Sequence, residues 1–135
     1  MGRSLLILLD THVVIWLAQD YKRISRAAHA AIEDVRNEDR GLAISDIALV
    51  EIAQLASHGR INLIPDAETV LAEVERRFVI LPITSSIAMQ AFGLPASYPK
   101  DPVDRVIGAT ALVEGLKLVT ADQAIRRSKA VPTIW

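Results

Sequence analysis

The hydrophobic and polar positions of this chain form two kinds of segment that alternate along the sequence. Short aliphatic runs without polar interruption, such as SLLILL at residues 4–9, predict strands buried on both faces of a parallel sheet. Longer segments carry apolar residues at helical spacing, as in SRAAHAAIEDVRNE at residues 25–38, where Ser25 is expected to cap the helix. The predicted strands are residues 4–9, 41–45, 78–83 and 117–120, with an edge strand at 131–135. The predicted helices are residues 11–19, 25–38, 46–57, 66–77, 85–94, 101–116 and 122–129.

Strands that alternate with helices predict an α/β fold with a largely parallel sheet and right-handed crossovers. A chain of 135 residues is long enough to bury its own core. The sequence contains no internal repeat and no linker, so we expect a single domain over residues 1–135.

Composition narrows the class of protein. The longest purely aliphatic run, residues 5–9, is far below the roughly 18 residues that a membrane span needs, so no membrane partner is expected. The chain has no cysteine and no recognisable signal peptide, so a cytoplasmic protein is expected. The net charge is −1, which gives no overall attraction to nucleic acid; a role in binding RNA would need a local basic patch.

Three of the predicted strands end at, or just before, a polar residue. The first strand runs into Asp10, the second into Ser45 and Asp46, and the strand at 117–120 into Ala121 and Asp122. In open α/β sheets the functional crevice lies outside the carboxyl ends of the strands, so Asp10 and Asp122 would emerge at one edge if their strands are parallel neighbours. Either acid could equally be the N-cap of the helix that follows it.

Two further acids are expected to point inward. Glu51 lies in a helix that is apolar almost all round, and a buried carboxylate costs several kcal/mol or shifts its pKa, which favours a functional role over an internal salt bridge. Asp104 shares a helix face with Ile107 and Ala111. Asp101, which precedes a proline, is expected to cap that helix, so Asp104 is the acid that points toward the sheet.

Four carboxylates in one site would repel one another, by about 4 kcal/mol for each pair at 4 Å and an effective dielectric constant near 20. Protons or cations must offset such a charge. Oxygen ligands without cysteine or clustered histidine favour Mg²⁺ or Mn²⁺ over zinc. The acids therefore predict metal-assisted attack on a phosphodiester.

Four segments carry these acids in order: LLDTHVVIWL, ISDIALVEIAQLASHGRI, DPVDRVIGATAL and LVTAD. Together they resemble the acidic motifs of the PIN-domain family, and most closely the VapC-type toxins of bacterial toxin–antitoxin pairs. The resemblance implies a three-layer α/β/α sandwich with a small parallel sheet. It also implies a homodimer, a cognate VapB-type antitoxin that masks the active site, and Mg²⁺-dependent endoribonuclease cleavage of single-stranded RNA loops.

The resemblance carries over the catalytic acids Asp10, Glu51, Asp104 and Asp122. As a hypothesis, Asp10 and Asp104 hold the metal directly, Asp122 completes the metal site, and Glu51 orients or deprotonates the attacking water. In-line attack would leave a 5′-phosphate and a 3′-hydroxyl.

Residues next to these acids could assist them. Thr120 resembles the small hydroxyl residue that the family places beside its last acid, and Arg105 could contact phosphate or the antitoxin. Lys100 and Arg105 flank the third acid, Arg126, Arg127 and Lys129 follow the fourth, and Lys22 and Arg23 come after the first predicted helix. As a set they could follow an RNA backbone, although each alone is more typical of a solvated surface.

Other functions stay open at this point. A PIN-like module could bind RNA or protein without cleaving it, although the intact acids argue against this. A phosphoacceptor domain of the response-regulator type has two adjacent acids after its first strand and a lysine after its last. Here a single Asp10 follows the first strand and Thr120 begins the segment where the lysine would stand. His12 and His58 are expected to be structural, and Trp16 to belong to the core or a dimer surface.

Overall fold

The computed structural model describes residues 6–37 and 41–135, so predicted strand residues 4 and 5 and predicted helix residue 38 lie outside the described part. The strands are β1 (Ile7–Leu9), β2 (Leu42–Ser45), β3 (Val79–Leu81), β4 (Leu118–Val119) and β5 (Thr133–Ile134). The helices are α1 (Thr11–Gln19), the 3₁₀ turn η2 (Tyr21–Arg23), α2 (Arg26–Asn37), α3 (Asp46–Ser57), α4 (Ala67–Arg77), α5 (Ser85–Gly93), α6 (Pro102–Glu114) and α7 (Gln123–Ser128). Within the described residues, no helix is both long and apolar enough to cross a membrane.

The five strands form one sheet in the order β3-β2-β1-β4-β5, and every neighbouring pair is parallel. This confirms the predicted α/β fold. The chain first builds outward from β1 to β3 and then returns to the other side of β1 with β4 and β5. The direction of winding thus reverses between β1 and β4, which is where open α/β sheets form their functional crevice.

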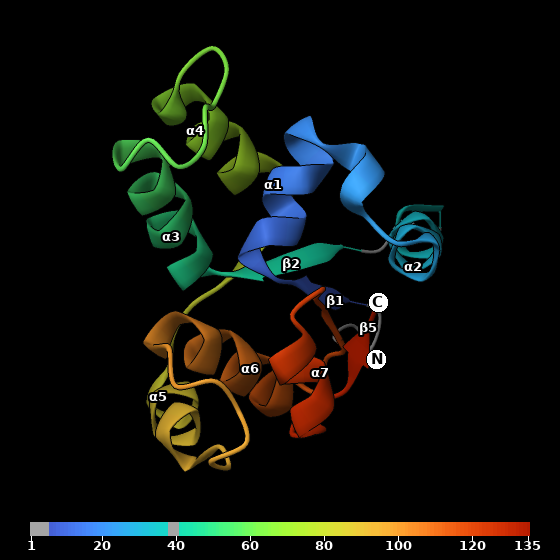
Figure 1. Ribbon diagram of the computed structural model, residues 1–135, viewed down its shortest axis with the longest axis vertical. Coiled ribbons are helices and arrows are strands. Elements are labelled where there is room, and N and C mark those ends of the chain that lie inside the picture. The colour runs from blue at the N-terminus through green and yellow to red at the C-terminus, as the bar shows by residue number, and fades with distance from the viewer. Residues whose placement is uncertain (1–5, 38–40) are drawn as a thin grey trace.

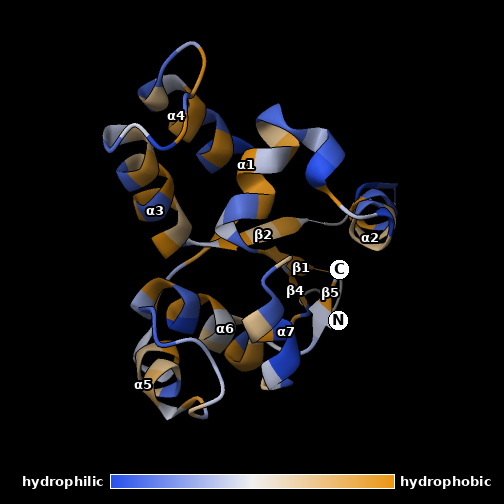
Figure 2. Cartoon of the chain, in the orientation of Figure 1, coloured by the Kyte–Doolittle hydropathy of each residue, from blue (hydrophilic) through white to orange (hydrophobic). Residues whose placement is uncertain are grey.

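Alternating strand residues face two separate cores, because successive side chains of a strand point to opposite faces of the sheet. Leu9 and Ile44 pack with α1, α2, α3 and α4, whereas Leu8 and Leu118 pack with α6 and α7. Figure 1 shows these helix groups on opposite sides of the sheet, with α5 lying against α6. In Figure 2 the central strands are mostly hydrophobic and the helices are mixed, as expected for strands covered on both faces.

The buried ring of Tyr98 supports the start of α6. Tyr98 is 1% exposed, and its hydroxyl donates a hydrogen bond of 2.7 Å to the backbone carbonyl of Asp104. The ring passes so close to the helix that a Cβ on Gly108 would lie 2.3 Å from Tyr98 Oη and 2.7 Å from Tyr98 Cζ. Gly108 is therefore needed for space, although glycine is a poor helix former.

We expect Gly108→Ala to destabilise the protein by about 1–3 kcal/mol, because the added methyl group overpacks the Tyr98 site. The matched control is Gly93→Ala, at the end of α5, where a Cβ meets no atom within 4 Å. Thermal or urea unfolding would measure both changes. An alanine that is as well tolerated at 108 as at 93 would show that the close approach of Tyr98 does not constrain α6.

Candidate functional site

The predicted acids line one cavity at the carboxyl edge of the sheet, beside the junction of β1 and β4. The cavity has a volume of about 320 Å³ and is lined by Asp10, His12, Trp16, Glu51, Asp101, Asp104, Ala121 and Asp122. These residues come from α1 and α3 on one side of the sheet and from the segments that start α6 and α7 on the other (Figure 1). The fold thus brings together four carboxylates that are far apart in the sequence.

Asp10 is the most deeply buried of these acids, at 7% exposure. Its backbone N–H donates a hydrogen bond of 3.0 Å to the carbonyl of Val119, which fixes Asp10 beside β4. Its Oδ1 accepts a bond of 2.8 Å from the Thr11 N–H, and its Oδ2 accepts one of 2.7 Å from the Thr120 hydroxyl. Burial raises the pKa of Asp10, and these two bonds only partly oppose that shift. Asp10 therefore caps α1 and also faces the cavity.

Thr120 connects Asp10 with Asp122. Its fully buried hydroxyl donates to Asp10 and accepts a bond of 3.1 Å from the Asp122 N–H. Asp122 in turn caps α7, since its Oδ1 accepts a bond of 3.0 Å from the Ile125 N–H. One hydroxyl thus holds the ends of β1 and β4 in a fixed relation.

The charge of Asp104 is strongly perturbed. It lies in the first turn of α6 and is half-buried. Burial and, in decreasing order, the carboxylates of Asp10, Asp101, Asp122 and Glu51 together raise the pKa of Asp104 to about 7. These couplings show that all five acids act on one electrostatic site.

Glu51 reaches the cavity from α3. Burial raises its pKa, the nearby Thr11 hydroxyl lowers it, and the charge of Asp10 raises it again. The helix is apolar almost all round, but the expectation that it is buried on most faces is wrong: Val50 is 60% exposed, because α3 covers the sheet with one face and leaves the other open. Glu51 is accordingly half-buried, at the border between the packed face and the cavity.

Four residues that line the cavity were not predicted as site residues: His12, Trp16, Asp101 and Ala121. Asp101 caps α6 as expected, with its Oδ1 accepting a bond of 2.8 Å from the Val103 N–H, but its charge also raises the pKa of Asp104 and Glu51. An N-cap and the third residue of a helix lie at the same end of that helix, so the spacing of Asp101 and Asp104 could have predicted that Asp101 also lies at the cavity. His12 and Trp16 also line the cavity, and their spacing of four residues on one helix was the signal there.

The prediction that Arg105 contacts phosphate or a partner is wrong. Its side chain is buried, and its Nη1 donates to the carbonyls of Ala91 and Leu94 at 3.1 and 3.3 Å. Its Nη2 donates to the carbonyls of Pro95 and Tyr98 at 3.5 and 3.4 Å. Arg105 points away from the acids because the segment that joins α5 to α6 offers it these backbone acceptors. It anchors α6 to that segment.

Basic side chains offset little of the charge of the cavity: His12 lines it and acts to lower the pKa of Asp10 and Glu51, but burial raises both pKa values by more. Within the described residues no lysine or arginine lines it, and Lys100, Arg126, Arg127 and Lys129 are exposed outside it. The buried Thr11 hydroxyl has no hydrogen-bond partner in the structure, although it lies near Glu51. A bound cation and its waters would satisfy these carboxylate oxygens and the unpaired Thr11 hydroxyl.

The acids do not form a closed metal cage. No three acidic or histidine side chains in residues 6–37 and 41–135 stand close enough together to enclose an ion by themselves. Mg²⁺ is usually held by one or two carboxylates and keeps several of its waters, so an open acidic cavity suits it better than a closed cage would. The donor set therefore fits a hard divalent cation.

Comparison with known proteins gives a consistent result. Residues 7–130 match the family described as PIN domain. The chain is 38% identical over 131 residues to Ribonuclease VapC22 of Mycobacterium tuberculosis (strain ATCC 25618 / H37Rv), covering 96% of this chain and 98% of the relative.

Solved structures with a similar fold include toxin–antitoxin complexes. VapBC2 from Rickettsia felis, bound to a DNA fragment from its promoter, matches with a TM-score of 0.71 at 16% identity, over 95% of this chain and 96% of that one. DNA-bound VapBC from Salmonella typhimurium matches with a TM-score of 0.69 at 21% identity, over 94% and 95%. These structural similarities show the fold. The family match and the 38% identity to Ribonuclease VapC22 show the family. The chain belongs to the PIN-domain family and, within it, to the VapC-type proteins.

Proposed function

We propose that this protein is a divalent-metal-dependent endoribonuclease that acts as the toxin of a toxin–antitoxin pair. The observation that carries the proposal is the convergence of Asp10, Glu51, Asp104 and Asp122 in one cavity without a lysine or arginine among the described residues that line it. The relative with 38% identity is named a ribonuclease, which supports RNA as the substrate. We further propose that residues 1–135 act as one domain and that the protein works in the cytoplasm.

The acids divide into two roles. Asp10, Asp104 and Asp122 would hold the cation, with Mg²⁺ proposed first and Mn²⁺ as its substitute. When bound, the ion would neutralise charge on the phosphoryl oxygens and lower the pKa of the attacking water. Glu51 orients that water and accepts its proton, a role that its raised pKa favours. In-line attack then leaves a 5′-phosphate and a 3′-hydroxyl.

Thr120 is a positioning residue in this scheme. Its hydroxyl donates to Asp10 and so leaves that carboxylate in one orientation, with Oδ1 engaged by the Thr11 N–H. The same hydroxyl accepts from the Asp122 N–H, which fixes the N-cap residue of α7. A change at Thr120 therefore acts on two cation-holding acids at once.

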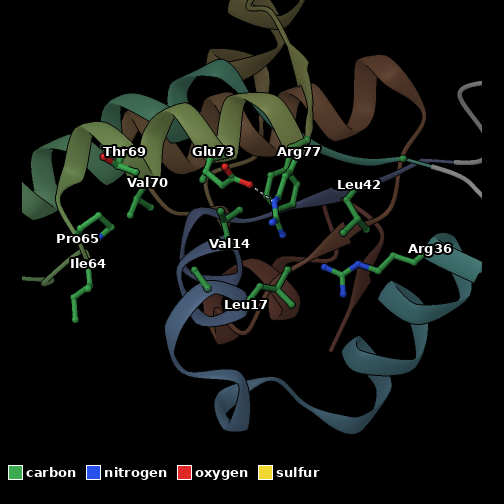
Figure 3. A pocket seen from close by; sticks show the side chains of 14 residues that line it. Val14, Leu17, Arg36, Leu42, Ile64, Pro65, Thr69, Val70, Glu73 and Arg77 are labelled. Carbon is green, nitrogen blue, oxygen red and sulfur yellow. Dashed lines mark hydrogen bonds and ion pairs between the residues drawn. The ribbon is translucent and has the colours of Figure 1, made fainter.

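An antitoxin is the proposed regulatory partner, as in the toxin–antitoxin complexes that share the fold. A groove of about 840 Å³ lies between α1, α2 and α4, on the side of the sheet that carries α1, and combines apolar residues with the charged side chains Arg36, Glu73 and Arg77. Figure 3 shows Val14 and Leu17 of α1 facing Val70 of α4 across it, with Ile64 at one end and Arg36 at the other. An apolar segment of the antitoxin would find a complementary surface here.

A second copy of the chain is the other proposed partner. Met89 and Phe92, three residues apart on α5, are 78% and 74% exposed. Residues at this spacing lie next to each other on a helix surface. A pair of large exposed apolar side chains is typical of an interface, and we propose that α5 contributes to a homodimer.

Asp10→Asn and Asp104→Asn are each expected to abolish RNA cleavage without unfolding the protein, because each removes a ligand charge and keeps the size of the side chain. The matched control is Asp34→Asn, at an exposed position of α2 outside the cavity. Cleavage of structured RNAs would be followed by gel with Mg²⁺, Mn²⁺ or a chelator. Undiminished cleavage by Asp104→Asn, or in chelator, would refute the metal-dependent nuclease and leave a binding module.

Thr120→Val is expected to lower kcat by about 10- to 100-fold, because loss of a buried hydrogen bond to a charged group is worth about 1.5–3 kcal/mol. The substitution keeps the shape of the side chain but leaves Asp10 without its donor. Thr120→Ser, which retains the hydroxyl, should stay close to the parent. If the two variants cleave RNA equally well, the hydroxyl has no positioning role.

Asp104→Asn is also expected to stabilise the cation-free protein above about pH 7. The folded state keeps the Asp104 proton up to its raised pKa of about 7, whereas the unfolded chain loses it near pH 4. The stability linked to this group is thus fully present below about pH 4 and is lost as the pH rises to about 7. Asparagine avoids that loss, about 1–2 kcal/mol after discounting for the partial exposure of the side chain.

Urea unfolding in chelator, at pH values from about 4 to 8, would measure this difference. The gap between Asp104→Asn and the parent should widen with pH, and Asp34→Asn should show no such trend. Addition of Mg²⁺ should favour the parent, because only the parent keeps the full ligand set. A gap that is constant over the whole pH range would show that Asp104 carries no raised pKa.

A further inference from the structure

A row of planar side chains leads away from the acidic cavity along α1. His12 and Trp16 are four residues apart, and their ring centroids are 6.1 Å apart with planes inclined at 51°. Both residues line the cavity together with the acids. The row continues to Arg23 of η2, whose guanidinium carbon lies 4.5 Å from the centroid of the Trp16 ring. We refer to His12, Trp16 and Arg23 as the aromatic row.

The packing of the core accounts for Trp16 but not for the other two members of this row. Trp16 is partly buried against the core, but His12 and Arg23 are exposed. The far side of Trp16 is supported by Trp135, with ring centroids 5.8 Å apart. The chain has only two tryptophans and 4% aromatic residues, and both tryptophans are placed here. The arrangement holds one exposed ring and one exposed guanidinium beside the site of the proposed chemistry.

The charge of the site makes such a surface useful. The cavity carries several carboxylates and no lining lysine or arginine in the described residues, so it repels the phosphates of an RNA strand. The net charge of −1 gives no compensating attraction from the whole molecule. Contacts beside the cavity would therefore add binding energy that the acids themselves cannot supply. Bases stack on aromatic rings and on guanidinium planes with little dependence on sequence, and Arg23 adds a positive charge.

We propose that the aromatic row is a nucleobase subsite, which holds an unpaired base of the RNA next to the phosphate that is cleaved. The proposal rests on the proposed nuclease function and adds to it the contact that positions the substrate. The base stacks on the exposed His12 ring, Trp16 supports that ring from the next turn of α1, and Arg23 contacts the adjoining phosphate or base. A base within a duplex has both faces covered by its neighbours, so the subsite selects single-stranded RNA.

The test uses His12→Ala, with His12→Phe to keep a flat ring and His58→Ala as the matched control. His58 is an exposed histidine at the end of α3 and does not line the cavity. Binding would be measured by fluorescence anisotropy in the Asp104→Asn background, with a labelled short single-stranded RNA and with an abasic ribose-phosphate chain of equal length. Steady-state cleavage of the same RNA would be measured without the Asp104 change.

His12→Ala should weaken binding of the single-stranded RNA by about 5- to 100-fold and raise KM more than it lowers kcat. It should leave binding of the abasic chain unchanged, because that chain has no base to stack. His12→Phe should bind RNA like the parent, and so should His58→Ala. Because His12 is exposed, all three variants should melt at the same temperature as the parent. If His12→Ala alone melts at a lower temperature, the RNA affinity of His12→Phe, which keeps a flat ring, still tests the stacking contact.

Equal RNA affinity and equal KM for His12→Ala and the parent would overturn the subsite. Unchanged RNA binding together with weaker binding of the antitoxin by His12→Ala would assign the aromatic row to a protein partner. That result would also overturn the subsite. Failure of the nuclease proposal looks different: the parent would then cleave no RNA with Mg²⁺ or Mn²⁺. The binding measurement still tests the subsite in that case. An affinity for RNA that depends both on the bases and on His12 would support the subsite even without cleavage.

Discussion

The burial and mutual repulsion of carboxylates are the constraint on which the rest of this structure depends. Burial and four neighbouring acids raise the pKa of Asp104 to about 7, so the site stores unfavourable charge that the surrounding fold must offset. Thr120 and the Thr11 N–H do this for Asp10, each with a hydrogen bond under 3 Å. The parallel sheet contributes by placing Asp10 and Asp122 at the ends of adjacent strands, where the helices diverge.

The same constraint explains the unusual packing around α6. Asp104 is useful only if the start of α6 stays beside the sheet, against the repulsion of the acids near it. Tyr98 donates to the carbonyl of Asp104, and Arg105 ties the helix to four carbonyls of the segment before it. Gly108 gives Tyr98 the room to do so. A buried arginine and a helical glycine, each unfavourable in isolation, thus hold one half-buried acid in place.

Much of this arrangement could be predicted from the sequence, because strand-end acids and helical spacing are local signals. The strands, the helices and the gathering of Asp10, Glu51, Asp104 and Asp122 in one cavity followed from them. Arg105 could not be placed in this way: its burial depends on carbonyls of residues 91–98, which only the tertiary fold brings near. The exposed face of α3 could not be predicted either, because an exposed apolar residue such as Val50 looks the same in the sequence as a buried one.

An acidic cavity in a nearly neutral protein also limits how a nuclease of this kind can find its substrate. Long-range attraction is absent, so an RNA phosphate approaches the acids only after a cation has reduced their charge and other contacts hold the strand. The basic side chains near the acids cannot supply those contacts from inside the cavity, because Arg105 is buried in the fold and the others lie outside it. A planar surface at the cavity rim answers this need, since stacking neither requires positive charge nor competes with the cation for the carboxylates. Selection of unpaired RNA would then come from the same contact that makes binding possible.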